Sequence, residues 1–304
     1  MAGPANNLIL TEQDLATPQL MSFAGGQVAV FSRRCPHRNT VNEDAAAVLE
    51  TSGKTGALVI ADGVGGMQAG HHASALAVNA LFQRLTGNTG HNSHLRSAIL
   101  DGFEDANDQI CELGVQAATT LAVIEVQQDR VRPYHVGDSM ILLCGQRGRL
   151  HWQSISHSPV GYAIESGMMD EIDAMSHPDR HYVSNLVGCP EMRIEIGPRM
   201  EMSPRDTLLI CSDGLSDNLS TDEIISVVRC GHLGNAVQKL VDIATQRMTS
   251  LGQQLSHPSK PDDLTIIAFR RVPLSSARKS HRKHSPRSAQ GNELIATPEG
   301  RQAG

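Results

Sequence analysis

The chain has 304 residues, of which 26 are Lys or Arg and 32 are Asp or Glu, so its formal net charge is −6. This balance argues against a dedicated nucleic-acid-binding protein, which would carry a basic excess. Apolar residues make up 40% and charged residues 19%, as in soluble globular proteins rather than disordered chains. Aromatic residues are only 3%, so the core is expected to consist of aliphatic side chains and Met.

The sequence contains no run of about 18 apolar residues, so no membrane span is expected. The first residues lack the basic and apolar regions of a secretory signal. The six cysteines are scattered without a CxxC pair, which favours reduced thiols over disulfides or a zinc site. These features together predict a cytoplasmic protein.

Charge and composition divide the chain into three parts: an N-terminal extension (1–19), one domain (20–271) and a basic tail (272–304). Residues 273–304 contain six Lys or Arg and two Asp or Glu, a net of +4, whereas the remaining 272 residues carry −10. The tail has no sustained apolar period and is expected to be disordered. It either forms a solvated extension or contacts an acidic partner.

Within the domain, the apolar patterns predict short strands and longer helices. Helices are expected around 73–85 and 95–113, and one or two more over 223–248, broken near Gly231 and Gly234. The stretch 156–190 is interpreted as irregular. Hairpin-like spacing of the strands favours an α+β fold with antiparallel sheets and helices outside them. The expected strands are 27–31, 45–49, 57–61, 120–126, 131–136, 140–144, 207–211 and 264–269.

Acidic residues lie at the ends of several predicted strands. Asp62 follows the first apolar run of this kind, Asp213 follows a second, and Asp262 precedes a third. Carboxylates gathered at one edge of a sheet repel each other unless a cation neutralises them. Ligand sets made only of oxygen suit Mg²⁺ or Mn²⁺ rather than zinc. The same placement at a strand end is found for Glu43, Asp44, Asp138 and Asp263.

Six short segments, most of which contain these acids, occur in an order that is typical of a known protein family. They are Asn42-Glu-Asp-Ala45, Ala61-Asp-Gly-Val-Gly-Gly66, Thr119-Thr-Leu121, Gly137-Asp-Ser139, Ser212-Asp-Gly-Leu-Ser-Asp217 and Asp262-Asp-Leu-Thr265. The chain resembles the type 2C (PPM) metal-dependent protein serine/threonine phosphatases, especially the bacterial ones, over about residues 20–271. The resemblance implies a four-layer α-β-β-α sandwich of two antiparallel sheets flanked by helices, with two metal ions in a cleft at one end.

The resemblance also implies the metal ligands. Asp62 bridges two Mn²⁺ or Mg²⁺ ions, and the Gly63 carbonyl binds one of them. Asp213 and Asp262 hold the other ion, while Asp263 replaces an Asn of the family pattern. The implied reaction is direct attack on phosphorus by a hydroxide that bridges the two ions, so that no side-chain nucleophile is needed.

Three further acids have supporting roles by the same resemblance. Glu43 ligates an ion directly or through water, Asp44 supports the ligands, and Asp138 helps to hold a weaker third ion. The implied substrate is phosphoserine or phosphothreonine in a protein, produced by a bacterial-type serine/threonine kinase. Two alternatives remain open: a non-catalytic relative that binds phosphoproteins, and a small-molecule phosphatase of the same fold.

One departure from the family pattern concerns phosphate binding. The family places a phosphate-binding Arg four residues before the Glu, where this chain has Asn39. Arg38 is expected to take this role because a guanidinium matches phosphate oxygens, and Arg33 and Arg34 are the alternatives.

Two other departures concern the residues beside the motifs. Val64 stands where some members have a His after the Asp-Gly, and Met140 stands where an Arg usually follows Gly-Asp-Ser. His71 and His72 are expected to be exposed at the start of a helix. Three further histidines, His157, His177 and His181, are interpreted as solvated loop residues.

Overall fold

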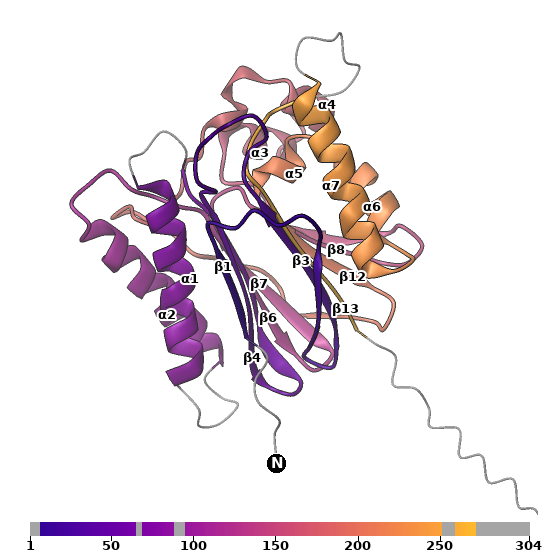
Figure 1. The fold of residues 1–304 in the computed structure, drawn as a ribbon, viewed down its shortest axis with the longest axis horizontal. Helices are drawn as coiled ribbons and strands as arrows, with labels where there is room; N and C mark the ends of the chain where they lie inside the picture. Colours follow the sequence, from indigo (N-terminus) through magenta and orange to yellow (C-terminus); the bar gives the residue numbers. More distant parts are fainter. Residues whose placement is uncertain (1–6, 65–68, 88–94, 251–258, 272–304) are drawn as a thin grey trace, which may run out of the picture. The chain divides into compact units, whose positions relative to one another are not determined.

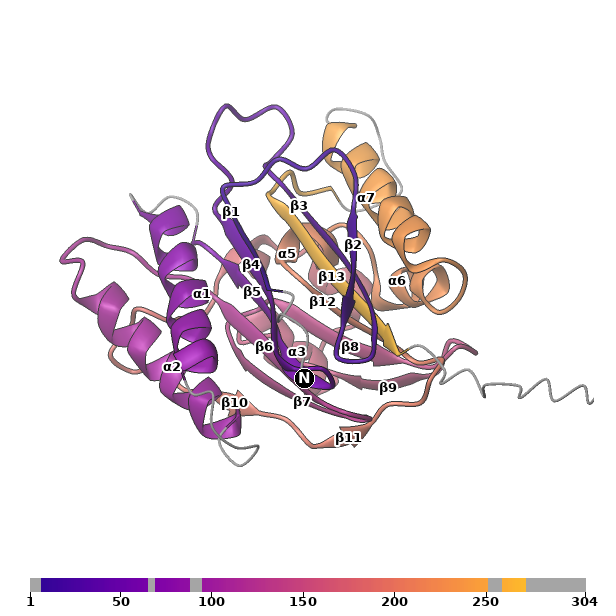
Figure 2. The same cartoon turned by 60° about the horizontal axis from the view of Figure 1, so that its bottom comes forward.

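The computed structural model describes residues 7–64, 69–87, 95–250 and 259–271. In these ranges two antiparallel sheets lie face to face, and helices cover the outer face of each sheet (Figures 1 and 2). The expected α-β-β-α sandwich is therefore confirmed. The chain divides into a compact unit, residues 1–273, and a second unit, residues 274–304, which lies outside the described residues. The expectation of a disordered tail falls in that second unit.

The first sheet has the strand order β1-β4-β5-β6-β7-β10, and β11 also pairs with β7. Two long helices, α1 (Gly70–Gly87) and α2 (Leu95–Cys111), cover its outer face. The strands are β1 (Leu8–Thr11), β4 (Asp44–Ser52), β5 (Thr55–Asp62), β6 (Leu121–Gln127), β7 (Arg130–Val136), β10 (Glu195–Ile196) and β11 (Met200–Glu201).

The second sheet has the order β2-β3-β13-β12-β8-β9, and α5 (Asp213–Ser216), α6 (Thr221–Val228) and α7 (Leu233–Thr249) cover it. Its strands are β2 (Gln19–Phe23), β3 (Gly26–Arg33), β8 (Met140–Cys144), β9 (Leu150–Gln153), β12 (Thr207–Cys211) and β13 (Leu264–Arg271). None of the described helices combines the length and apolarity that a membrane span requires.

Strand β5 shows how the sequence builds the layers. Successive side chains of a strand point to opposite faces of the sheet. Leu58 and Ile60 therefore lie in the layer between the sheets, whereas Val59 and Ala61 lie against the helices. All four side chains are completely buried. The continuous apolar run that precedes Asp62 is thus explained by burial on both faces, and it brings this acid to the end of a central strand.

Two expectations about secondary structure are wrong. Residues 1–19 are not simply an extension, because β1 pairs with β4 from Leu8↔Val48 to Thr11↔Ala45 and Leu10 is buried. Residues 156–190 are not irregular throughout, because they contain three short helices. The Ser158 side chain accepts a hydrogen bond from the Gly161 N–H and so caps the first of them. The helices are α3 (Pro159–Glu165), α4 (Glu171–Met175) and the 3₁₀ helix η1 (Pro178–His181).

Candidate metal centre

The acids predicted to bind metal come together at one end of the sandwich, from both sheets. Asp62 ends β5 and lies opposite Asp44 in the β4–β5 pair. Asp213 begins α5, directly after β12. The two sheets are joined here by Ser212, whose hydroxyl donates to Asp44 Oδ2 at 2.8 Å and accepts from the Thr265 N–H at 3.0 Å. The described acids therefore face one another across the junction of the sheets.

The electrostatics of Asp62 show how crowded this region is. Burial raises the pKa of Asp62 well above its usual value, and the charges of Asp44, Asp213, Asp262 and Asp138 raise it further, in that order. A carboxylate surrounded by other carboxylates is poorly stable without a counterion. The arrangement therefore calls for added positive charge.

Two other acids show the same effect. Burial, and then the charge of Asp213, raises the pKa of Asp138 and of Asp262 to about 7. Asp138 follows Gly137, whose φ of +104° is a conformation that favours glycine. A Cβ at Gly137 would also lie 2.6 Å from the Thr120 Cβ. Asp138 is thus placed by a turn that only glycine fits.

Asp263 has a structural role that differs from that of its neighbour Asp262. Its Oδ1 accepts the Cys35 N–H and its Oδ2 accepts the Glu43 N–H, both at 2.6 Å. An amide in its place would have only one acceptor oxygen. The acid therefore holds both ends of segment 35–43, which carries Arg38.

The backbone around Gly63 is closely surrounded. The Gly63 N–H donates to the Glu43 carbonyl at 3.1 Å, and the Ser74 hydroxyl donates to the same carbonyl at 2.5 Å. A Cβ at Gly63 would lie 2.4 Å from the Gly70 carbonyl oxygen, and one at Gly70 would lie 2.9 Å from Glu43 Oε1. Because both positions lack a Cβ, the first turn of α1 approaches Glu43 and Gly63 directly.

The three candidate phosphate-binding arginines lie in different surroundings. Arg33 donates to the Leu15 carbonyl at 3.0 Å, and Arg34 pairs with Asp14 at 3.1 Å. Arg38 is exposed, and its side chain has no hydrogen-bond or ion-pair partner among the described residues. Burial raises the pKa of Glu43, and the positive charge of Arg38 partly opposes that shift. Of the three, Arg38 is thus the one that is close to the acids and free to bind an anion.

Lys260 belongs to this site, although no motif in the sequence predicts it. Its Nζ forms ion pairs with Asp213, with Asp217 Oδ2 at 2.8 Å and with Asp262 Oδ2 at 3.4 Å. The only signal in the sequence is its position two residues before Asp262. Ser212 also has a role that its place in the motif does not reveal, since its hydroxyl links the two sheets.

The expectation that His157 is a solvated loop residue is wrong. The residue is 4% exposed, its Nδ1 accepts the Gly137 N–H, and its Nε2 is 3.0 Å from Glu195 Oε2. Because Nδ1 accepts, Nε2 carries the proton and donates to Glu195. His135, His157 and Glu195 have ligand atoms within 4.8 Å of one another, yet both nitrogens of His157 are already used in hydrogen bonds. This group therefore supports the Gly137 turn.

The other side chains named from the sequence agree with expectation only in part, because His71 and His177 are half-buried. His72 is exposed as expected, whereas His71 is half-buried, and their rings are tilted by 41° with centroids 4.0 Å apart. His181 is exposed, whereas His177 accepts the Asp179 N–H at 3.1 Å and caps η1. Met140 is buried under the helices of the second sheet. Val64 is half-buried beside Gly63, and residues 65–68 of the same motif lie outside the described residues.

The donor set fits hard divalent cations. The acids offer carboxylate oxygens, and their mutual repulsion is relieved by a cation of high charge. Asp44 is 1% exposed, and its Oδ1 has no hydrogen-bond partner. A buried carboxylate oxygen without a hydrogen-bond partner indicates that a cation binds nearby.

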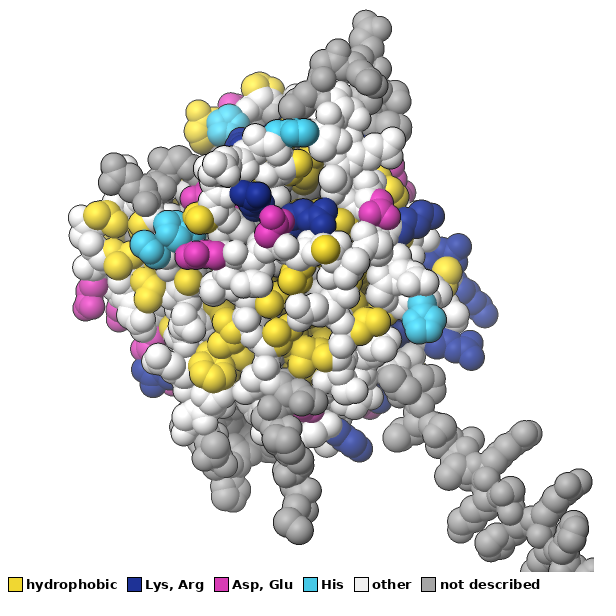
Figure 3. Space-filling view, viewed as in Figure 1, with side chains coloured by type: hydrophobic (Ala, Val, Ile, Leu, Met, Phe, Trp, Pro, Cys, Tyr) yellow, Lys and Arg dark blue, Asp and Glu magenta, His cyan; other side chains and the backbone are white. Residues whose placement is uncertain are grey.

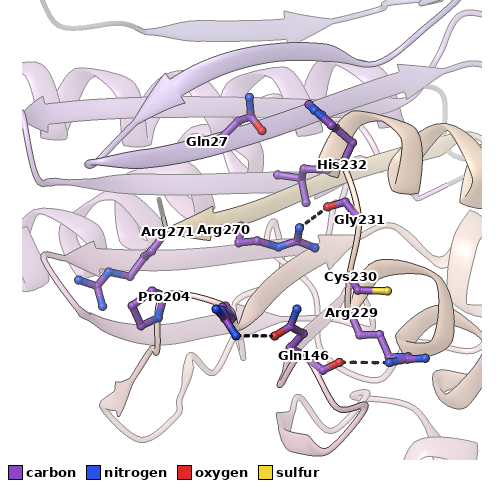
Figure 4. A pocket seen from close by; sticks show the side chains of 11 residues that line it. Gln27, Gln146, Pro204, Arg229, Cys230, Gly231, His232, Arg270 and Arg271 are labelled. Atoms are coloured by element: carbon purple, nitrogen blue, oxygen red, sulfur yellow. Dashed lines mark hydrogen bonds between the residues drawn. The ribbon is translucent and has the colours of Figure 1, made fainter. Parts of the chain in front are cut away.

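A pocket of about 310 Å³ lies away from these acids, where β13 ends (Figure 4). The Arg270 side chain crosses it and donates to the Gly231 carbonyl at 2.6 Å, and Arg229 donates to the Gln146 carbonyl at 3.2 Å. Its arginines thus connect loops, whereas the candidate metal centre lies where β13 begins. On the face shown in Figure 3, acidic and basic side chains lie next to one another above a hydrophobic area.

Comparison with known proteins identifies the family of this chain. The family model described as protein phosphatase 2C matches residues 33–256. The chain belongs to the protein phosphatase 2C family. It is 25% identical over 246 residues to a serine/threonine phosphatase, stp, of Listeria welshimeri, an alignment covering 78% of this chain and 93% of the relative.

Solved structures of protein phosphatase 2C proteins agree with the fold. A serine/threonine phosphatase of S. agalactiae superposes with a TM-score of 0.69 at 26% identity, covering 81% of this chain and 99% of that protein. The catalytic domain of PstP, described in complex with 2 manganese ions, has the same fold, with a TM-score of 0.63 at 24% identity over 81% of this chain and 97% of its own. The expected serine/threonine phosphatase activity is thereby confirmed through the family.

Proposed function

We propose that the carboxylate cluster is the catalytic centre of this phosphatase and that it holds two divalent ions. The observation that carries the proposal is the position of Asp62. It lies at the end of the first sheet. Its pKa is raised mainly by burial and then by the charges of acids from both sheets. A bridging position between two cations is the place where such a carboxylate is most stabilised.

The surrounding residues suggest how the ions are shared. Glu43 and the Gly63 carbonyl would hold one ion together with Asp62, because the approach of α1 brings them side by side. Asp213 and Asp262 would hold the other ion, because both contact the same ammonium group from two different elements.

Two more acids complete the assignment. Asp138 would help to hold a weaker third ion, since the charge of Asp213 acts on it. Asp44 would support the centre through its hydrogen bond from Ser212.

When bound, the ions supply a Lewis acid that lets water ionise near neutral pH and neutralises phosphoryl charge. The protein itself supplies position. Arg38 would bind the non-bridging phosphate oxygens through its guanidinium. Asp263 fixes the segment that carries Arg38, and Gly137 fixes the turn that carries Asp138.

The finer biological assignments are proposed from the sequence. The substrate would be a protein phosphorylated by a serine/threonine kinase, in the cytoplasm. The basic residues of 272–304 would contact an acidic partner. A non-catalytic relative is less favoured, because the predicted ligand acids lie close enough for their charges to act on one another. A small-molecule phosphatase is less favoured, because the family model that matches is described as a protein phosphatase.

Hydrolysis of phosphopeptides tests the proposed function. Matched phosphoserine, phosphothreonine and phosphotyrosine peptides and an aryl phosphate would be incubated with Mn²⁺, Mg²⁺ or EDTA, and phosphate release measured. We expect turnover of the phosphoserine and phosphothreonine peptides with metal and none with EDTA. Binding of the peptides without turnover would instead identify a non-catalytic relative, and turnover restricted to the aryl phosphate would identify a small-molecule enzyme.

A further inference from the structure

Lys260 places a positive charge inside the acidic centre. Its side chain is 18% exposed, and its Nζ contacts oxygens of Asp213, Asp217 and Asp262. Burial alone would lower the pKa of Lys260, but the charges of these three acids raise it well above its usual value, so the group is an ammonium ion. In the described part of the chain, no other lysine contacts an acid of the centre.

The backbone at Lys260 is fixed by a buried side chain. The Lys260 N–H donates to Asn218 Oδ1 at 2.9 Å, and Asn218 Nδ2 donates back to the Lys260 carbonyl at 2.9 Å. The same Nδ2 donates to the Gly214 carbonyl at 2.9 Å, and Asn218 is fully buried. Asn218 thus connects the turn that carries Asp213 to the strand entry that carries Lys260. The ammonium is placed by the fold and not by a freely moving surface chain.

We propose that Lys260 is a built-in cation that competes with the divalent ion for Asp213 and Asp262. This inference rests on the proposed function, since it concerns the same ligands. An ammonium group and a divalent ion repel each other and need the same carboxylate oxygens, so the ion can bind fully only when Lys260 withdraws. Among the residues that the structure describes, no lysine forms an ion pair with Glu43 or Asp62, the acids proposed to hold the other ion. The two positions therefore load unequally, one tightly and one weakly.

Calorimetric titration of the metal-free protein with Mn²⁺ tests the competition. We expect one stronger and one weaker Mn²⁺ site in the wild type. Lys260→Met removes the charge and keeps the length of the side chain, so it should strengthen the weaker site at least about tenfold, the effect of losing one charge-assisted hydrogen bond. Lys260→Arg keeps the charge and should retain a weak second site. Lys239→Met, at an exposed position on α7, is the matched control and should bind Mn²⁺ like the wild type.

Thermal melting gives a second readout that does not depend on turnover. In EDTA, Lys260→Met should melt at a lower temperature than the wild type, because it leaves three carboxylates without their cation. Saturating Mn²⁺ should raise its melting temperature by more than it raises that of the wild type. Lys239→Met should show neither change.

Chemical labelling of the wild type tests the inference even if Lys260→Met does not fold. Acetic anhydride would be applied in EDTA and in saturating Mn²⁺, and the acetylation of Lys260 measured by mass spectrometry against that of Lys54 and Lys239. We expect Lys260 to be protected in EDTA and to become reactive with Mn²⁺. Equal labelling in both conditions, or a second site whose affinity is unchanged in Lys260→Met, would overturn the competition while leaving the proposed function intact. Absence of Mn²⁺ binding in both proteins would overturn both.

Discussion

At the scale of single residues, Asp62 lies where a negative charge is strongly disfavoured. It ends a fully buried strand run, is itself half-buried, and is surrounded by acids from both sheets. Its charge is therefore costly in the metal-free protein and becomes useful only when cations are bound. Removing that charge should abolish activity while leaving the protein folded.

Asp62→Asn is expected to lower phosphopeptide turnover by more than about 100-fold, because metal-assisted catalysis contributes several kcal/mol. In EDTA the variant should melt at or above the wild-type temperature, since one repelling charge is removed. Turnover and melting are the two measurements, and Asp101→Asn on the exposed face of α2 serves as the control. Wild-type turnover in Asp62→Asn would exclude the proposed centre.

Arg38 allows a second test at the same scale. If it binds the phosphate of the substrate, Arg38→Ala should mainly raise KM and lower kcat/KM about 10- to 150-fold, the loss of one charge-assisted contact. Arg34→Ala is the matched control, because Arg34 already pairs with Asp14. Steady-state kinetics with a phosphopeptide would measure both. A silent Arg38→Ala beside a damaging Arg34→Ala would move the phosphate-binding role to Arg34.

At the scale of elements, helix α6 is tied to α7 by one acid. Glu223 accepts the Ser220 N–H in a capping box and pairs with Arg247 of α7. The hydrogen bond from Arg247, followed by that from the Ser220 N–H, lowers the pKa of Glu223 to about 2, against the opposing effect of burial. One side chain thus stabilises the start of one helix and its contact with the next.

Glu223→Gln is expected to destabilise the protein by about 1 kcal/mol near neutral pH through weakened capping. A carboxyl whose pKa is lower in the folded state stabilises that state above its unfolded value of about 4.5, and this contribution disappears as the pH falls toward 2. The difference in unfolding free energy between the two proteins should therefore shrink over that range. Urea unfolding at several pH values measures it, and a constant difference would contradict the ion pair.

The elements also show which parts of this fold can be predicted from sequence. Strands β8 and β12 lie exactly where the apolar runs 140–144 and 207–211 placed them, because both are buried on each face. Strands β1 and β10 have four and two residues, too few for a period of two to be visible. The acids proposed as metal ligands are recognisable in the sequence by their place at strand ends. Lys260 was not, because its role depends on the Asn218 contacts, which join residues 42 positions apart.

At the scale of the whole molecule, residues 274–304 of the tail form a unit separate from residues 1–273. Because 272–304 has no core-forming pattern, its deletion is expected to leave the melting temperature and aryl-phosphate turnover nearly unchanged. Melting and turnover of the truncated chain would measure this. A large decrease in either would show that the tail contributes to the folded domain, and loss of activity only toward protein substrates would support its proposed role in partner contact.

The layer between the sheets is expected to influence the geometry of the proposed metal centre. Ile124 of β6 lies in this layer, whereas Ile99 of α2 lies in the outer layer, and both are fully buried. Ile124→Ala and Ile99→Ala should each cost about 2–5 kcal/mol in unfolding free energy. Only Ile124→Ala should weaken Mn²⁺ binding, measured by calorimetry under conditions where both variants are folded. Equal Mn²⁺ affinities would show that the centre tolerates changes in this layer.

The two halves of the centre belong to different sheets, with Asp62 on one and Asp213 and Asp262 beside the other. The thickness of the layer between them therefore sets the separation of the ligands. Over evolutionary time, a methyl group lost from that layer on one sheet would have to be regained on the other for catalysis to persist. In the outer helical layers, a change in side-chain volume needs no compensating change to preserve the separation of the ligands. Substitutions should accordingly covary in volume across the inner layer and drift independently outside it.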